Sequence, residues 1–272
     1  MQNSDKTPTI PAGSKILPGS FASVPELDTD ERLDTLVGTS FRLIQKIDGT
    51  AFAIDTLLLA WFATLPAIGG RVADLGSGSG VLSFMLKARR ADLEIVGIEI
   101  QEEFHRLALR NACLNPNAKG LAFEHLDVRE IPSKLLPESF DFVVANPPYY
   151  PMGSGKLPPK GTRAAARHEL SGTLRDFIEG AAYLLPYGSR LAMVIPAGRF
   201  FEASEIFKIS NMGLRRVRFV LPKEGDQAHL ALIEVERFYN GPHEALESFP
   251  IHLADGRFSE VVDELFKRGL HP

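Results

Sequence analysis

From Arg71 to about residue 236, short apolar runs alternate with longer segments of helical periodicity. We expect strands at 71–75, 94–99, 121–126, 140–146, 190–196, 214–221 and 229–236. Helices are expected between them at 79–90, 101–114, 173–185 and 201–212. Strands that alternate with helices of this length are typical of βαβ units, in which neighbouring strands run parallel.

The last two expected strands depart from this pattern. Only the segment PKEGDQA (222–228) separates them, which is too short for a helical crossover, so they should pair antiparallel. The sequence therefore predicts an α/β, Rossmann-like fold. Its sheet should have seven mostly parallel strands and a terminal antiparallel hairpin, with helices on both faces.

The two ends of the chain look different from this centre. Residues 1–31 are rich in Pro and Ser and poor in large apolar groups, so we expect a flexible tail there. A strand at 41–47 followed by Asp48-Gly49 predicts an N-terminal hairpin, because glycine accepts a positive φ at the turn. We expect one domain over 40–245 and a C-terminal extension over 246–272.

Composition narrows the class of protein. The 272 residues hold 30 Lys and Arg against 34 Asp and Glu, for a net charge of −4. This balance argues against a uniformly basic nucleic-acid binder, but it allows a local basic patch. The single cysteine, Cys113, cannot form an internal disulfide, and no apolar run is long enough for a membrane span. We expect a monomeric protein of the cytoplasm.

A glycine-rich loop, DLGSGSG (74–80), lies between the first strand and the first helix of this alternation. Gly76, Gly78 and Gly80 permit a tight turn and let backbone N–H groups approach a ligand closely. Asp74 is unusual beside a pyrophosphate, because like charges repel, but it suits a cationic ligand such as S-adenosylmethionine. NAD is the alternative ligand, and tight packing is the purely structural explanation.

Two further carboxylates follow neighbouring strands. Glu99 ends the second strand, where a carboxylate can accept hydrogen bonds from both ribose hydroxyls. Asp127, just past the third strand, could accept from the adenine amino group of the same ligand. Ligands of open α/β sheets lie at the carboxyl ends of strands, so the glycine loop and both acids should meet there.

The segment Asn146-Pro147-Pro148-Tyr149 closes the fourth strand. The Asn146 amide oxygen and the Pro147 carbonyl are two acceptors that could orient one –NH2 group, while Tyr149 stacks on the ring that carries it. Alignment of that nitrogen with a methyl donor requires no metal and no strongly shifted acid or base. A plain turn is the structural alternative.

Together these motifs resemble the class I amino-group methyltransferases, and more closely the bacterial N6-adenine methyltransferases acting on valine tRNA beside the anticodon. Gln45, FAIDTLLLA (52–60), RAAARHE (163–169) and the last strand pair carry the closer resemblance, which covers about residues 40–240. It implies S-adenosylmethionine as cofactor, S-adenosylhomocysteine as product, and a catalytic segment of Asn146, Pro147, Pro148 and Tyr149. The implied cofactor-binding positions are Asp74, Gly76, Ser77, Gly78, Gly80, Glu99, Ile100, Asp127, Val128 and Asn146.

The segment after this tetrapeptide is basic. Residues 151–168 hold Lys156, Lys160, Arg163 and Arg167 but no acid, and Gly153, Gly155 and Gly161 favour mobility. We expect this mobile loop to contact RNA phosphates, while Tyr149 contacts the substrate base. A second basic cluster comprises Arg215, Arg216, Arg218 and Lys223, with a solvated surface as the alternative. We expect the acceptor to be an adenine of RNA, with tRNA first. A glutamine amide of a release factor and a non-catalytic RNA-binding module remain the alternatives.

Overall fold

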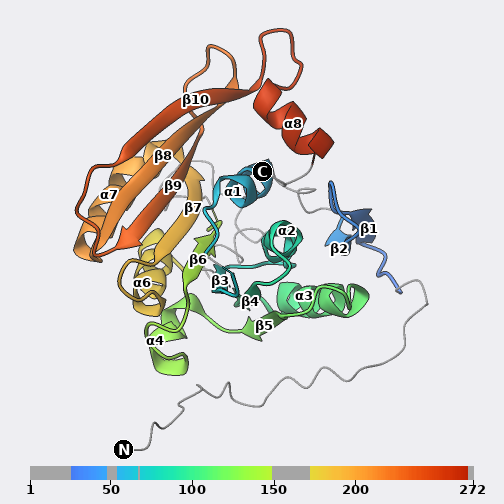
Figure 1. Cartoon of the computed structure of the whole chain (residues 1–272). Helices are drawn as coiled ribbons and strands as arrows, with labels where there is room; N and C mark the ends of the chain where they lie inside the picture. Colours follow the sequence, from blue (N-terminus) through green and yellow to red (C-terminus); the bar gives the residue numbers. More distant parts are fainter. Residues whose placement is uncertain (1–25, 48–53, 67, 149–171, 269–272) are drawn as a thin grey trace, which may run out of the picture.

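A computed structural model describes residues 26–47, 54–66, 68–148 and 172–268 (Figure 1). The strands are β1 (Glu31–Thr35), β2 (Arg42–Lys46), β3 (Arg71–Leu75), β4 (Glu94–Glu99), β5 (Leu121–His125), β6 (Phe142–Ala145), β7 (Arg190–Pro196), β8 (Met212–Lys223), β9 (Leu230–Arg237) and β10 (Glu244–His252). The helices are α1 (Ile54–Phe62), α2 (Val81–Arg89), α3 (Glu102–Leu114), α4 (Ile131–Lys134), α6 (Leu174–Leu184), α7 (Phe200–Ile209) and α8 (Glu260–Arg268), with 3-10 turns η1 (Val128–Glu130) and η2 (Ala197–Arg199).

The central sheet has the strand order β10-β8-β9-β7-β6-β3-β4-β5. All neighbours are parallel except β9, which runs antiparallel to both β7 and β8. The chain leaves β3 toward β4 on one side and later returns to β6 on the other. Such a switch in direction opens a crevice at the carboxyl ends of the strands, which is where ligands of α/β sheets bind.

Two apolar cores cover the two faces of this sheet. On one face, α1, α2, α3 and α8 contribute buried residues such as Leu58 and Phe84. On the other face, α4, α6 and α7 contribute residues such as Phe177 and Phe207. The predicted α/β architecture with helices on both faces is therefore confirmed. Within the described part of the chain, no helix is long and apolar enough to cross a membrane.

The sheet has eight strands among the described residues, not the seven that were predicted. The predicted β8–β9 hairpin is confirmed, but β10 adds a parallel strand beyond it, with Phe249 opposite Val220. This strand lies mostly within the expected C-terminal extension. Phe249 is the only fully buried residue of β10, which has no alternation of apolar and polar positions, so its sequence carries little strand signal.

The predicted strand at 41–47 corresponds to β2, and its observed partner is the upstream strand β1, with Leu33 opposite Ile44. The expected Asp48-Gly49 turn lies outside the described residues, as does most of the expected tail. The β1–β2 hairpin forms a separate small sheet that packs beside α3 (Figure 1).

The arginines of the second basic cluster are engaged within the protein. Arg216 donates from Nε to the fully buried carboxylate of Glu234 at 2.8 Å, and Thr64 donates to that carboxylate through its backbone N–H at 2.5 Å. Arg215 lies over the ring of Tyr239. Arg218 lies over the rings of Trp61 and Phe249. These contacts give the three arginine side chains a structural role, which their positive charge in the sequence does not indicate.

Replacing Arg216 should therefore cost stability. We expect Arg216→Met to lower the free energy of unfolding by about 3 kcal/mol, because the buried Glu234 carboxylate loses its charged partner. Urea denaturation at pH 7 measures this. Arg215→Met is the matched control, since its ion pair with Glu236 is partly exposed and worth about 1 kcal/mol or less. Equal losses in the two variants would contradict the assignment.

Candidate active site

A cavity of about 360 Å³ lies at the carboxyl ends of β3, β4 and β6. Several of the predicted site residues line it together, namely Gly76, Gly78, Glu99, Ile100, Val128, Asn146 and Pro148. The remaining wall is mostly apolar, from Ile98, Phe104, Leu126 and Phe177. The structure thus places the glycine loop, the first strand-end acid and the Asn-Pro-Pro segment around one space.

The glycine loop needs its glycines for conformation and for space. Gly76, Gly78 and Gly80 all have positive φ, a region that other residues rarely adopt. A Cβ atom on Gly76 would also lie 3.1 Å from the ring of Phe177. The backbone N–H groups of Gly76 and Ser77 donate to the Ile98 carbonyl at 2.8 and 3.0 Å, which fixes the loop on the end of β4.

Glu99 holds the same loop with its side chain. It is only 5% exposed, and its Oε2 accepts from the Gly78 N–H at 2.9 Å. Its Oε1 accepts from the Gln101 N–H at 2.8 Å. Burial raises the pKa of Glu99, although these backbone hydrogen bonds oppose the rise. The carboxylate is therefore fixed in direction on the cavity wall.

Asp74 occupies a different environment from the one expected of a ligand contact. Its carboxylate is 1% exposed, accepts from the Ser83 hydroxyl at 2.6 Å, and does not belong to the cavity lining. Burial raises the pKa of Asp74 to about 7; the Ser83 hydrogen bonds lower it, and the nearby Glu99 charge adds to the rise. The Asp74 side chain therefore anchors the first turn of α2 through Ser83.

Asp127 lies at the start of η1, between two residues that line the cavity. Its carboxylate accepts from the Arg129 backbone N–H at 2.9 Å and from the Arg129 guanidinium. Burial alone would raise the pKa of Asp127, but the hydrogen bonds from Arg129 outweigh it and lower the pKa. Asp127 itself is not part of the cavity lining, and neither are Ser77 and Gly80.

Asn146 is oriented by a residue that the motifs did not point to. Its Nδ2 donates to the Thr56 hydroxyl of α1 at 2.9 Å, while the Thr56 backbone N–H donates to the Asp55 carboxylate at 2.7 Å. Because the amide nitrogen faces Thr56, the Asn146 oxygen is directed elsewhere. The only sequence signal for Thr56 was its place within FAIDTLLLA, one of the segments that carry the resemblance.

The sequence model of the family called methyltransferase small domain matches residues 48–208, more than half of the chain. The chain belongs to this methyltransferase family. A relative from Aeromonas hydrophila named tRNA1(Val) (adenine(37)-N6)-methyltransferase is 32% identical over 213 residues, covering 77% of this chain and 85% of the relative. One of the same name from Porphyromonas gingivalis is 30% identical, covering 65% and 72%. The expected resemblance to this group is confirmed.

A solved structure extends the comparison to the fold. The crystal structure of a predicted O-methyltransferase from Agrobacterium tumefaciens superposes with a TM-score of 0.65 and 21% identity. The match covers 80% of this chain and 98% of that protein. The two proteins therefore share this α/β fold, and the cavity lies at its crevice.

Five predicted site residues of this methyltransferase cannot be placed. Tyr149, Lys156, Lys160, Arg163 and Arg167 all lie outside the described residues. Pro147 is described and buried, and it is not part of the cavity lining, unlike its chain neighbours Asn146 and Pro148.

The raised pKa of Asp74 predicts a pH-dependent stability. A carboxyl with a folded-state pKa near 7 and an ordinary value of 3.8 binds protons more tightly when folded, so its stabilisation is complete below about pH 4 and is lost toward pH 7. As the pH rises from 4 to 7, we expect the free energy of unfolding of the wild type to fall relative to that of Asp74→Asn. Above pH 7 the difference between the two proteins should level off. Urea denaturation of the ligand-free methyltransferase from pH 4 to 8 measures it. A difference that does not change with pH would contradict the assignment.

Proposed function

We propose that this methyltransferase transfers a methyl group from S-adenosylmethionine to the exocyclic N6 of an adenine in tRNA, near the anticodon. The observation that carries the proposal is the Asn146 amide, oriented by Thr56 at the wall of a cavity that Gly78 and Glu99 also line. Relatives named as tRNA1(Val) (adenine(37)-N6)-methyltransferases support the choice of acceptor.

The cavity residues fit the cofactor. Glu99 offers a carboxylate on the wall, held in direction by the Gly78 and Gln101 N–H groups, that would accept the ribose hydroxyls. Phe104, Leu126 and Val128 line an apolar part of the cavity suited to an adenine ring. Asp127, next to this part, is our proposed acceptor for the adenine amino group. When bound, S-adenosylmethionine supplies a methyl group on a positively charged sulfur.

The Asn-Pro-Pro segment would hold the acceptor. The Asn146 oxygen and the Pro147 carbonyl accept the two hydrogens of the amine, which directs the nitrogen lone pair toward the methyl group. Thr56 restricts the Asn146 amide to one orientation, so this alignment exists before the substrate binds. In our proposal Tyr149 stacks on the acceptor ring. No strong base is required, because the proton leaves after transfer.

Contact with the RNA is assigned to the basic segment after the motif. We propose that Lys156, Lys160, Arg163 and Arg167 bind phosphates around an adenine that has turned out of its stack. An enzyme with this substrate works where tRNA is found, in the cytoplasm, and we propose that it acts as a monomer.

The acceptor is tested with labelled S-adenosylmethionine and two substrates, unmodified tRNA and a release factor. We expect label only in tRNA, at an N6-methyladenine identified by nucleoside mass spectrometry. Label in the release factor would assign a glutamine amide as acceptor instead. Label in neither substrate would contradict the proposed activity.

Substitution of Asn146 separates acceptor alignment from cofactor binding. We expect Asn146→Ala to lower kcat by about a thousandfold, because the amine loses an orienting acceptor. The affinity for S-adenosylmethionine in calorimetry should stay within about threefold, a change below 1 kcal/mol. We expect Thr56→Val to lower kcat by about tenfold, since it removes only the partner of the Asn146 amide. A lost cofactor affinity in Asn146→Ala would overturn the role of this residue.

The basic segment is tested through the salt dependence of tRNA binding. Replacing both Lys156 and Arg163 by Ala should reduce the slope of log K against log salt by about 1.5 to 2, as expected for two lost phosphate contacts. The matched control replaces Lys119 and Lys134, which are exposed and lie outside the basic segment, before β5 and at the end of α4. An unchanged slope in the first double variant would remove the segment from the RNA contact.

A further inference from the structure

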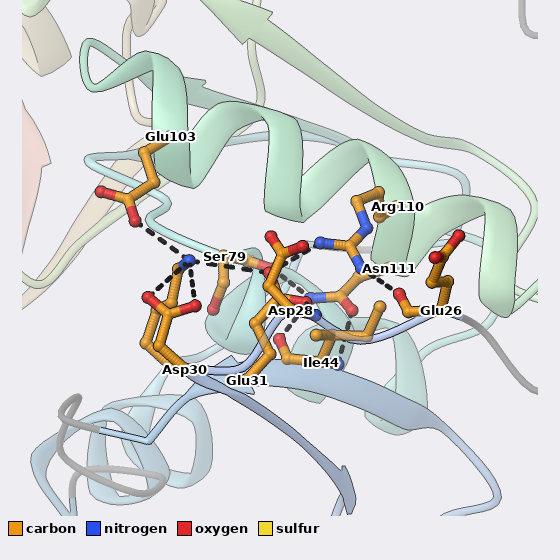
Figure 2. A network of polar contacts seen from close by, with 10 residues as sticks. Glu26, Asp28, Asp30, Glu31, Ile44, Ser79, Glu103, Arg110 and Asn111 are labelled. Atoms are coloured by element: carbon orange, nitrogen blue, oxygen red, sulfur yellow. Dashed lines mark hydrogen bonds and ion pairs between the residues drawn. The ribbon is translucent and has the colours of Figure 1, made fainter.

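The side chain of Asn111 connects two parts of the molecule that are distant in sequence (Figure 2). It is fully buried on α3. Its Oδ1 accepts from the Ile44 N–H of β2 at 2.7 Å, and its Nδ2 donates to the Ile44 carbonyl at 3.2 Å. The same Nδ2 donates to the Ser79 carbonyl of the glycine loop at 2.9 Å.

Asn115 makes the equivalent pair of bonds one helical turn away. Its Oδ1 accepts from the Arg42 N–H at 3.0 Å and its Nδ2 donates to the Arg42 carbonyl at 2.7 Å. Four helical residues rise about 6 Å, close to the two-residue spacing of a strand, so the two amides match alternate residues of β2. Together they pair the edge of β2 that does not face β1.

Ion pairs strengthen the same contact. Glu31 of β1 has a buried side chain and accepts from Arg110 of α3 at 2.7 Å. The Lys46 Nζ of β2 lies 3.1 Å from a carboxylate oxygen of Glu103 of α3 and 3.1 Å from one of Asp30. The β1–β2 hairpin is therefore docked on α3 by charged side chains as well as by the two asparagines.

Among the two asparagines, only Asn111 also reaches the glycine loop. It binds the Ser79 carbonyl, and Glu99 binds the N–H of the preceding residue, Gly78. The segment from Gly78 to Ser79 is thus held at two points, by Glu99 of the cavity wall and by Asn111, which also binds the hairpin. Asn115 makes the same contact with β2, but its remaining hydrogen bond goes to the Asn111 carbonyl within α3, at 2.8 Å.

We propose that Asn111 is a positioning residue that couples docking of the β1–β2 hairpin to binding of the methyl donor in the glycine loop. The inference rests on the proposed function, in which that loop binds S-adenosylmethionine. Loss of the Asn111 amide frees the Ser79 carbonyl and loosens the loop that Gly78 and Glu99 present to the donor. Because coupling of two binding events is reciprocal, bound donor also stabilises the docked hairpin.

The experiment compares Asn111→Ala with Asn115→Ala in the full chain. We expect both variants to lower Tm, because each loses hydrogen bonds to β2. Calorimetry with S-adenosylmethionine should show a dissociation constant raised about tenfold in Asn111→Ala and changed by less than about twofold in Asn115→Ala. Equal changes in the two variants, or none in Asn111→Ala, would overturn the inference.

A conservative variant removes both bonds that the Asn111 Nδ2 donates, to Ile44 and to the loop, and keeps the bond from the Ile44 N–H. Asn111→Asp keeps an acceptor for the Ile44 N–H but cannot donate to the Ser79 carbonyl, so we expect it to bind the donor as weakly as Asn111→Ala. Donor affinity equal to that of the wild type would overturn the inference. Should Asn111→Ala fail to fold, this variant carries the same comparison against Asn115→Ala.

Hydrogen exchange tests the reciprocal effect without measuring activity. Saturating S-adenosylhomocysteine should slow exchange in a peptide covering 41–47 in the wild type and leave it unchanged in Asn111→Asp. Equal slowing in both proteins would overturn the coupling. A wild type that binds no donor would overturn the proposed function together with the inference, whereas normal binding with unchanged variants overturns the inference alone.

Discussion

A buried carboxylate at the end of β4 fixes the geometry on which the site depends. Parallel pairing of β3 and β4 sets Leu75 opposite Ile98, so the loop that leaves β3 begins beside Glu99. The Ile98 carbonyl accepts the first two N–H groups of that loop, and Glu99 accepts the N–H of Gly78. Positive φ at the glycines lets the loop follow this path.

The opposite wall of the cavity comes from a different direction along the chain. β6 lies on the other side of β3 and ends at Ala145; the amide of the next residue, Asn146, is bound by Thr56 of α1. In the proposed function, the end of β4 presents the donor side and the end of β6, on the other side of β3, presents the acceptor side. The two sides share β3, so the sheet itself sets the separation between them.

The parts predicted well from the sequence are those with strong periodicity. β3 and β7 begin and end where expected, since their apolar runs are buried on both faces of the sheet. The roles of side chains that depend on tertiary contacts could not be predicted from the sequence. The Asp74 carboxylate turns to Ser83, and Thr56 reaches Asn146 across 90 positions in the chain. Neither pairing leaves a local pattern, because the partners meet only after the sheet and α1 have packed.

The eighth strand, β10, gives the C-terminal segment a place in the central sheet. β8 is twelve residues long, and β10 pairs with its outer side from Glu244 to His252. A shortened chain ending near residue 243 would leave that row of backbone groups on β8 unpaired, which is a template for association between copies. β10 thus covers the outer side of the long strand β8 and makes itself the edge of the sheet.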